Sequence, residues 1–153
     1  MKTKELVKFL NAAVPLELQE EYDNSGLLVG NPDSEIKGVL VTVDVTEEVI
    51  NEAKRKGANF ILSHHPLIFS GLKSLTGKDR VERTVIHAVK NDISIYAAHT
   101  NLDNVKDGFN FMVACKLGLQ NQRILRPQND QLIKLAFFVP HDHADQVRKA
   151  VFE

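Results

Sequence analysis

The stretch Ala58-Asn-Phe-Ile-Leu-Ser-His-His-Pro66 decides how we interpret the fold of this chain. Residues 58–62 form a short apolar run that begins directly after Gly57, and a run of that length with such a boundary predicts a buried strand. The run ends in polar residues, because Ser63 is followed by the adjacent histidines His64 and His65. The stretch therefore predicts a buried strand that carries two imidazoles at its carboxyl end.

The same pattern occurs on both sides of this stretch. Residues 39–43 predict a strand that ends at Asp44, and residues 93–98 predict one that ends at His99. Helical periodicity lies between the strands, over residues 47–56 and 80–90, and the capping residues Thr46 and Asp79 precede the two helices. Strands that alternate with helices of this length indicate βαβ units with right-handed crossovers. The fold class is therefore α/β, with a mostly parallel or mixed sheet.

The flanking segments are less regular. Residues 3–14 predict an amphipathic helix with Thr3 as its N-cap, and residues 108–117 predict a helix capped by Asp107, with Cys115 on its buried side. Apolar runs around the turn residues 22–26 and 30–33 predict a small hairpin-like piece. Residues 132–139 predict a further strand, and residues 143–152 predict the start of a helix.

Composition excludes several classes of protein. The chain has 153 residues, a formal net charge of −1 and one cysteine, so no internal disulfide can form. The near-neutral charge gives no general attraction to nucleic acid or to anionic membranes, and no apolar stretch is long enough to span a bilayer. A single cysteine is typical of a reducing compartment. We therefore expect a cytoplasmic protein with no membrane partner and no nucleic-acid partner.

The strand ends predict a metal site. In an open α/β sheet, ligands bind outside the carboxyl ends of the strands, where His64, His65, His99 and Asp103 would meet. Within a strand, adjacent histidines would point to opposite faces, but a bend before Pro66 could aim the two rings at two neighbouring ions. Imidazole and carboxylate ligands suit zinc, iron, manganese or nickel. The alternative, which stays open, is that the histidines bond to loop carbonyls and that Asp103 caps a turn.

For Asp44 and for the loop at residues 71–78, a structural role is favoured over a functional one. Asp44 is favoured as a cap of the following helix over a supporting role beside a histidine. Residues 71–78 resemble a phosphate-binding loop only superficially, because the glycines are too far apart and Asp79 stands where Ser or Thr is required. The basic side chains of this region could attract an anionic substrate, but a solvated helix face is favoured. These side chains are Lys73, Lys78, Arg80 and Arg83.

Three motifs, residues 23–27, 63–69 and 98–103, resemble the dinuclear-metal-centre family. Its bacterial members include YbgI- and YqfO-type proteins, which are catalogued as GTP cyclohydrolase 1 type 2 homologues. The resemblance covers roughly residues 3–127. It implies an α/β fold, a toroidal homohexamer and two divalent metal ions per subunit.

The resemblance also implies which residues bind the metals. His64, His65 and Asp103 match metal ligands of the family, and His99 is expected near the metals with its role as a ligand left open. The family completes the site with a histidine and a glutamate, for which this sequence has no matching pair. The tail from Leu132 onward looks like the start of the PII-like domain that is inserted in longer members. We therefore expect residues 1–128 to form the N-terminal half of the metal-binding domain, and residues 129–153 to begin an incomplete inserted domain.

Two functions are compatible with these residues. The first is a hydrolase in which metal-activated water attacks a nucleotide or a related small molecule. The second is a non-catalytic metal-binding or regulatory assembly protein that acts through protein partners. The chelating groups are expected at an exposed sheet edge that a substrate can reach, which favours the hydrolase.

Overall fold

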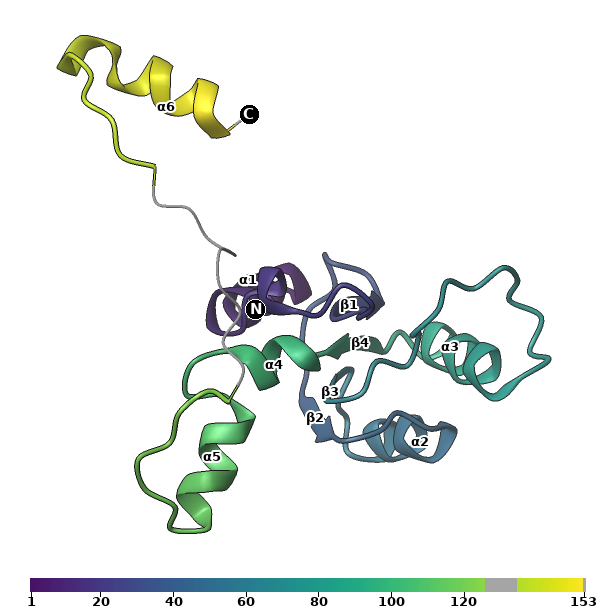
Figure 1. The fold of residues 1–153 in the computed structure, drawn as a ribbon. Helices are drawn as coiled ribbons and strands as arrows, with labels where there is room; N and C mark the ends of the chain where they lie inside the picture. Colours follow the sequence, from purple (N-terminus) through teal and green to yellow (C-terminus); the bar gives the residue numbers. More distant parts are fainter. Residues whose placement is uncertain (126–134, 153) are drawn as a thin grey trace. The chain divides into compact units, whose positions relative to one another are not determined.

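Four short strands form the central sheet in the computed structural model, which describes residues 1–125 and 135–152 (Figure 1). The strands are β1 (Gly26–Val29), β2 (Val39–Thr42), β3 (Phe60–Ser63) and β4 (Ser94–Ala97). Their order in the sheet is β1-β4-β3-β2, with β2, β3 and β4 parallel and β1 antiparallel to β4. The predicted α/β class with a mixed sheet is confirmed.

The two crossover helices begin where the sequence predicts. In α2 (Glu47–Arg55), the Val49 N–H donates to the Thr46 hydroxyl at 3.3 Å. In α3 (Arg80–Lys90), the Glu82 N–H donates to the Asp79 carboxylate at 2.9 Å. Each bond satisfies one of the backbone donors that a helix N-terminus leaves without an intrahelical partner.

Helices cover both faces of the sheet. Ile61 and Ile95 point to one face, where they pack with Ile50 of α2 and Val85 of α3 in the larger core cluster. The opposite face carries the fully buried side chains of Phe60 and Tyr96, which pack against α1 (Thr3–Ala13). This alternation along each strand follows from the two-residue repeat of a β-strand.

The hairpin-like piece and the Thr3 cap are wrong. Residues 34–36, which follow the turn, bond to the start of the chain instead of to β1. The Thr3 N–H donates to the Ser34 carbonyl at 2.9 Å, and the Ile36 N–H donates to the Met1 carbonyl at 3.0 Å. β1 pairs instead with β4, with Gly26 opposite Ala97. Thr3 is the first helical residue and is buried, whereas Lys2 occupies the N-cap position.

A short helix, α4 (Thr100–Asn104), precedes the predicted helix near residue 108. That second helix is α5 (Phe109–Lys116), and Gly108 rather than Asp107 is its N-cap residue. The expected cap is wrong because Asp107 lies in a left-handed turn with φ of 61° before the helix. Cys115 on α5 is exposed, so its predicted burial is also wrong.

The chain divides into two units, Met1–Gln120 and Asn121–Glu153. In the second unit a 3₁₀ turn, η2 (His141–His143), leads into α6 (Ala144–Phe152), close to the predicted helix. Residues 135–139 form no strand, and the rest of the predicted strand, residues 132–134, lies outside the described residues. The predicted domain boundary at 128/129 also falls outside them, so the two-domain division stays a prediction.

Among the residues described, no helix has both the length and the apolar character needed to cross a membrane.

Candidate metal centre

Three histidines meet at the carboxyl ends of two neighbouring strands. His64 and His65 follow β3, and His99 follows β4, which lies beside β3 with Ser63 opposite Ala97. One ring nitrogen from each histidine lies within 4.8 Å of the others. The ring centroids are 5.0 Å (His64 and His65), 5.2 Å (His64 and His99) and 5.6 Å (His65 and His99) apart.

Hydrogen bonds determine which nitrogen each ring offers. His64 Nδ1 lies 2.9 Å from the Ala98 carbonyl oxygen, and because a carbonyl only accepts, Nδ1 carries the proton. His65 Nδ1 lies 2.8 Å from Asp44 Oδ1, and His99 Nδ1 lies 2.9 Å from Asp23 Oδ1. In each neutral ring, Nε2 is then left with a lone pair. Metal-binding histidines normally donate their other N–H to a carbonyl or a carboxylate in this way.

Asp23 organises one side of the site. Its side chain is fully buried and also accepts from the Ser25 hydroxyl at 2.9 Å and the Asn24 N–H at 2.6 Å. The backbone N–H of Thr100 donates to it at 3.0 Å, and the Thr100 hydroxyl donates as well. Burial raises the pKa of Asp23, but the hydrogen bonds from Thr100, His99, Asn24 and Ser25 together hold the pKa far below its usual value. Asp23 is therefore a carboxylate that holds His99 in one orientation.

Asp44 supports His65 rather than capping α2. The helix-cap interpretation is wrong, because Thr46 caps α2 and Asp44 Oδ1 bonds to the His65 ring. The two acidic partners differ in burial, since the Asp44 side chain is 65% exposed and that of Asp23 is 0% exposed. Sequence reasoning missed the support by Asp23, which lies 76 residues from His99 in the chain.

Asp103 lies on α4, one helical turn after His99, where its backbone N–H donates to the His99 carbonyl at 3.2 Å. In the part of the chain that the structure describes, the group of donor atoms close enough to share an ion consists of the three histidines. The role of Asp103 as a metal ligand therefore stays a prediction.

Aromatic rings line the site. The Phe109 ring stacks on His64 with centroids 5.7 Å apart, and the Phe69 ring stands edge-on to His99 at 6.4 Å. Both phenylalanines are about half exposed, at 47% and 50%. Phe69 also contacts the Tyr22 ring at 6.3 Å. The histidines are thus reachable from solvent beside apolar surface that a ligand could cover.

The donor set fits a divalent transition-metal ion. A Zn–N bond is about 2.0–2.1 Å long, so two nitrogens on one ion are at most about 4.2 Å apart. A cluster whose donor atoms lie within 4.8 Å of one another needs only small side-chain movements to bind one ion. The same spread suits two ions side by side, which sit about 3.5–4 Å apart in dinuclear sites.

The other histidines lie elsewhere. His87 is on α3, where its Nε2 lies 3.0 Å from Asn51 Oδ1. His141 and His143 belong to η2 in the second unit.

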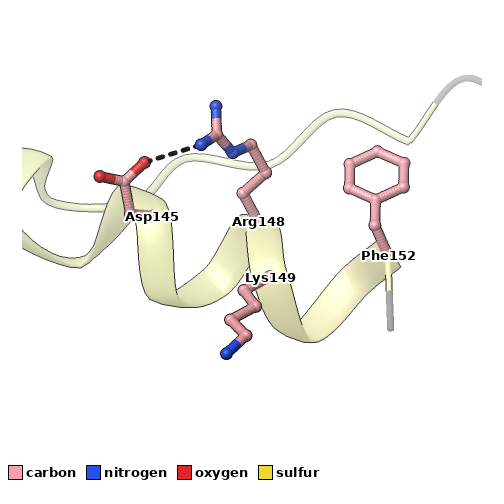
Figure 2. A pocket seen from close by; sticks show the side chains of 4 residues that line it. All are labelled: Asp145, Arg148, Lys149 and Phe152. Carbon is pink, nitrogen blue, oxygen red and sulfur yellow. Dashed lines mark ion pairs between the residues drawn. The ribbon is translucent and has the colours of Figure 1, made fainter.

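The second unit also has a surface hollow of about 430 Å³ on α6, lined by Asp145, Arg148, Lys149 and Phe152. Arg148 and Asp145 form an ion pair with a nitrogen–oxygen distance of 3.1 Å. Figure 2 marks this pair with a dashed line. The lining of this hollow contains no histidine.

Comparison with known proteins identifies the family of the chain. The profile of the family Duf34/NIF3 (NGG1p interacting factor 3) matches residues 1–152. A protein of Halalkalibacterium halodurans named GTP cyclohydrolase 1 type 2 homolog is 46% identical over 138 residues, which is 90% of this chain and 37% of that protein. A Staphylococcus aureus protein of the same name is 41% identical over 155 residues, which is 100% of this chain and 42% of that protein.

Solved structures give the same result. The crystal structure of a Bacillus cereus protein related to NIF3 matches with a TM-score of 0.78 and 39% identity, over 99% of this chain and 42% of that one. Reduced HcgD from Methanocaldococcus jannaschii matches with a TM-score of 0.74 and 36% identity, over 86% of this chain and 51% of that one. The chain thus spans about two fifths of the length of these curated relatives. With its sheet, its histidine cluster and a profile match over nearly its whole length, the chain belongs to the Duf34/NIF3 family.

Proposed function

We propose that this chain forms part of a metal-dependent hydrolase that binds two divalent ions and acts on a nucleotide or a related small molecule. One observation carries the proposal: three histidines at adjacent strand ends each engage Nδ1 with an oxygen and leave Nε2 for a ligand. A histidine that only satisfied a local hydrogen bond would not require two others within 4.8 Å. The family assignment supports the same interpretation.

The side chains of the site have distinct roles in this proposal. Asp23, the Ala98 carbonyl and Asp44 fix the tautomer and orientation of the three rings. Divalent ions at such a site lower the pKa of bound water and polarise a substrate oxygen. His65 and Asp44 are more exposed than His99 and Asp23, so in this proposal substrate approaches from the side of His65. Asp103 of this chain completes the proposed ligand set, together with a histidine and a glutamate that come from outside this chain.

We also propose a homo-oligomer, with the hexamer of the family as the expected state. Support comes from the edge strand β2, where Val39 and Val41 are 45% and 72% exposed on the face that α1 covers elsewhere. Val43, just beyond the strand, is 58% exposed. Apolar surface of this kind is typical of contacts between chains or domains. The proposed compartment is the cytoplasm, consistent with a single cysteine.

Elemental analysis tests the metal site directly. The chain, purified without chelator, is expected to contain close to two divalent ions, and His64→Ala/His65→Ala is expected to lose them. His87→Ala is the matched control, because His87 bonds to Asn51 on a helix away from the cluster and its loss should leave the metal content unchanged. The proposal would be contradicted if neither the unmutated chain nor a longer relative that carries the remaining ligands binds metal when zinc, iron or manganese is supplied.

A hydrolysis screen separates the two function classes. Turnover of nucleotides that disappears on chelation and in His65→Ala supports the hydrolase. Bound metal with no turnover of any nucleotide, in this chain or in the longer relatives, would favour the non-catalytic assembly protein instead.

A further inference from the structure

An open hollow of about 500 Å³ lies directly after the metal-site histidines in the chain. Its wall begins at Pro66, the residue after His65, and continues along the loop to the first turn of α3. Phe69 belongs to this wall and also contacts the His99 ring, with centroids 6.4 Å apart. The hollow and the histidine cluster therefore share a boundary. Its volume lies in the range typical of small-molecule sites.

A buried carboxylate holds the loop that forms this hollow. Glu82 is 1% exposed and accepts from the backbone N–H groups of Thr76 and Gly77, at 2.8 and 2.9 Å. It also accepts from the hydroxyls of Ser74 and Thr76, at 2.8 and 3.0 Å. The Glu82 side chain thus holds the loop before α3, which has no regular secondary structure, through several hydrogen bonds. Long loops that are ordered in this way are often binding loops.

The hollow has an excess of positive charge. Of its charged side chains, Lys78 pairs with Glu82, with atoms 3.3 Å apart, and Asp79 caps α3. Lys73 and Arg80 line the hollow, and neither has a carboxylate within ion-pair distance in the described part of the chain. Arg83, the fourth basic residue of this region, is paired with Glu47 at 3.2 Å. Two cations are therefore available to a ligand.

The rest of the wall is apolar. Leu67 and Leu72 line the hollow, and the half-exposed Phe69 presents an aromatic ring to it. Two cations suit the two charges of a phosphate monoester, and a guanidinium can bond to phosphate through two N–H groups. An aromatic ring beside apolar side chains suits a flat ring system. Both features are expected of one molecule that carries a phosphate and a planar ring.

We propose that this hollow is the substrate pocket and that Lys73 and Arg80 bind the phosphate of an aromatic phosphate ester such as a nucleotide. Glu82 is a positioning residue that keeps the loop in its binding conformation. The statement that the bound molecule reacts at the histidine cluster rests on the proposed function, whereas its binding in the hollow does not.

Binding of nucleoside monophosphates tests the proposal. AMP and GMP are titrated calorimetrically into the chain, with adenosine and guanosine as probes that lack the phosphate. At least one monophosphate is expected to bind at least tenfold more tightly than its nucleoside. Lys73→Gln/Arg80→Gln should weaken that binding at least tenfold and leave both the nucleoside affinity and the metal content unchanged.

A matched variant controls for the loss of two charges. Lys54→Gln/Arg55→Gln removes the same charge from the far end of α2, near the amino ends of the strands, and is expected to bind the monophosphate as the unmutated chain does. The proposal is overturned if neither monophosphate binds, if phosphate adds no affinity, or if Lys73→Gln/Arg80→Gln has no effect.

Repeating the titration with and without zinc separates this proposal from the proposed function. If the chain binds no metal but needs Lys73 and Arg80 to bind AMP or GMP, the phosphate pocket is supported and the hydrolase is contradicted. If the chain binds metal and its affinity for AMP and GMP does not depend on these two residues, the hydrolase remains and the phosphate pocket is contradicted.

Discussion

The candidate centre depends on which nitrogen each histidine presents. All three rings have Nδ1 engaged with an oxygen, so the orientation of Nε2 is determined before any ion arrives. This preorganisation comes from residues far away in the chain, since Asp23 and Asp44 precede their histidines by 76 and 21 residues. An affinity measurement on these partners therefore tests the site without removing a ligand.

Asp23→Asn is expected to weaken metal binding by about 10–100-fold, because the variant loses the negative charge that orients the His99 ring. It should also lower the free energy of unfolding by about 2 kcal/mol, since hydrogen bonds to a charged group are lost in a buried place. Competition with a chromophoric chelator measures the first effect, and urea denaturation measures the second.

Asp44→Asn provides the comparison. Its side chain is 65% exposed, so its hydrogen bond to His65 competes with water, and a smaller effect on both quantities is expected. Equal effects of the two substitutions would show that burial of the acidic partner does not determine how firmly the ring is held.

The histidines could be found from the sequence, and support of a histidine by Asp44 was the less favoured of two interpretations, whereas the role of Asp23 was not found. His64, His65 and His99 are identified because each follows an apolar run, and the ends of parallel strands meet at one sheet edge. Asp23 belongs to the motif at residues 23–27, but nothing in that motif indicates a hydrogen bond to His99. Its role arises only when β1 pairs with β4, which places the loop before β1 beside α4.

At the scale of elements, the loop before α3 is stabilised by an ionised group. Burial raises the pKa of Glu82, but hydrogen bonds from Thr76, Ser74 and Lys78 hold it far below its usual value. A carboxyl group whose pKa is lower in the folded than in the unfolded chain stabilises the fold above the unfolded-state pKa. This stabilisation is lost as the pH falls through the folded-state pKa.

Glu82→Gln should therefore lower the denaturation midpoint most at neutral pH, and its difference from the unmutated chain should narrow below about pH 4. Urea denaturation at several pH values gives this profile. Glu21→Gln, at an exposed position, is the control and should change the midpoint little at any pH. A difference for Glu82→Gln that does not change with pH would contradict the ionised-carboxylate explanation.

Gly108 allows α4 and α5 to approach each other. A Cβ at this position would lie 2.1 Å from the Leu102 carbonyl oxygen and 2.7 Å from a methyl group of Val105. Gly108→Ala is expected to destabilise the chain by about 1–3 kcal/mol, as other overpacking substitutions do. Gly71→Ala, where a Cβ meets nothing within 4 Å, should change stability by less than about 1 kcal/mol. Thermal unfolding of both variants checks this difference.

The sequence predicts regular elements better than their irregular neighbours. Capping by Thr46 and Asp79 and the apolar periodicity identify α2 and α3, because these signals lie within a few residues of one another. The antiparallel addition of β1 was missed, because it depends on pairing between segments about 70 residues apart. The short helix α4 was missed because five residues are too few to show a helical period.

At the scale of the whole molecule, the metal site joins distant parts of the chain. Its residues come from the loop before β1 and from the ends of β3 and β4, so they converge only in the folded state. The unfolded chain retains only the adjacent pair His64 and His65. A metal ion should therefore stabilise the fold with little competition from the unfolded state.

Zinc at 100 times its dissociation constant is expected to add about 2.7 kcal/mol to the stability of the chain. Differential scanning calorimetry with and without zinc measures the rise in Tm, and EDTA should reverse it. His64→Ala/His65→Ala should show no rise. A rise of the same size in this variant would place the stabilising ion elsewhere.

The attachment of the loop to Glu82 has a consequence for proteolysis. Exposed loops are the usual sites of nicking, and this loop contains the trypsin targets Lys73 and Lys78. A protease needs an extended segment in its cleft, and the loop cannot extend while Glu82 holds Ser74, Thr76 and Gly77. Trypsin can cleave at these lysines only after the loop has opened locally. The native chain should therefore resist trypsin at this loop, although its sequence contains two cleavage sites.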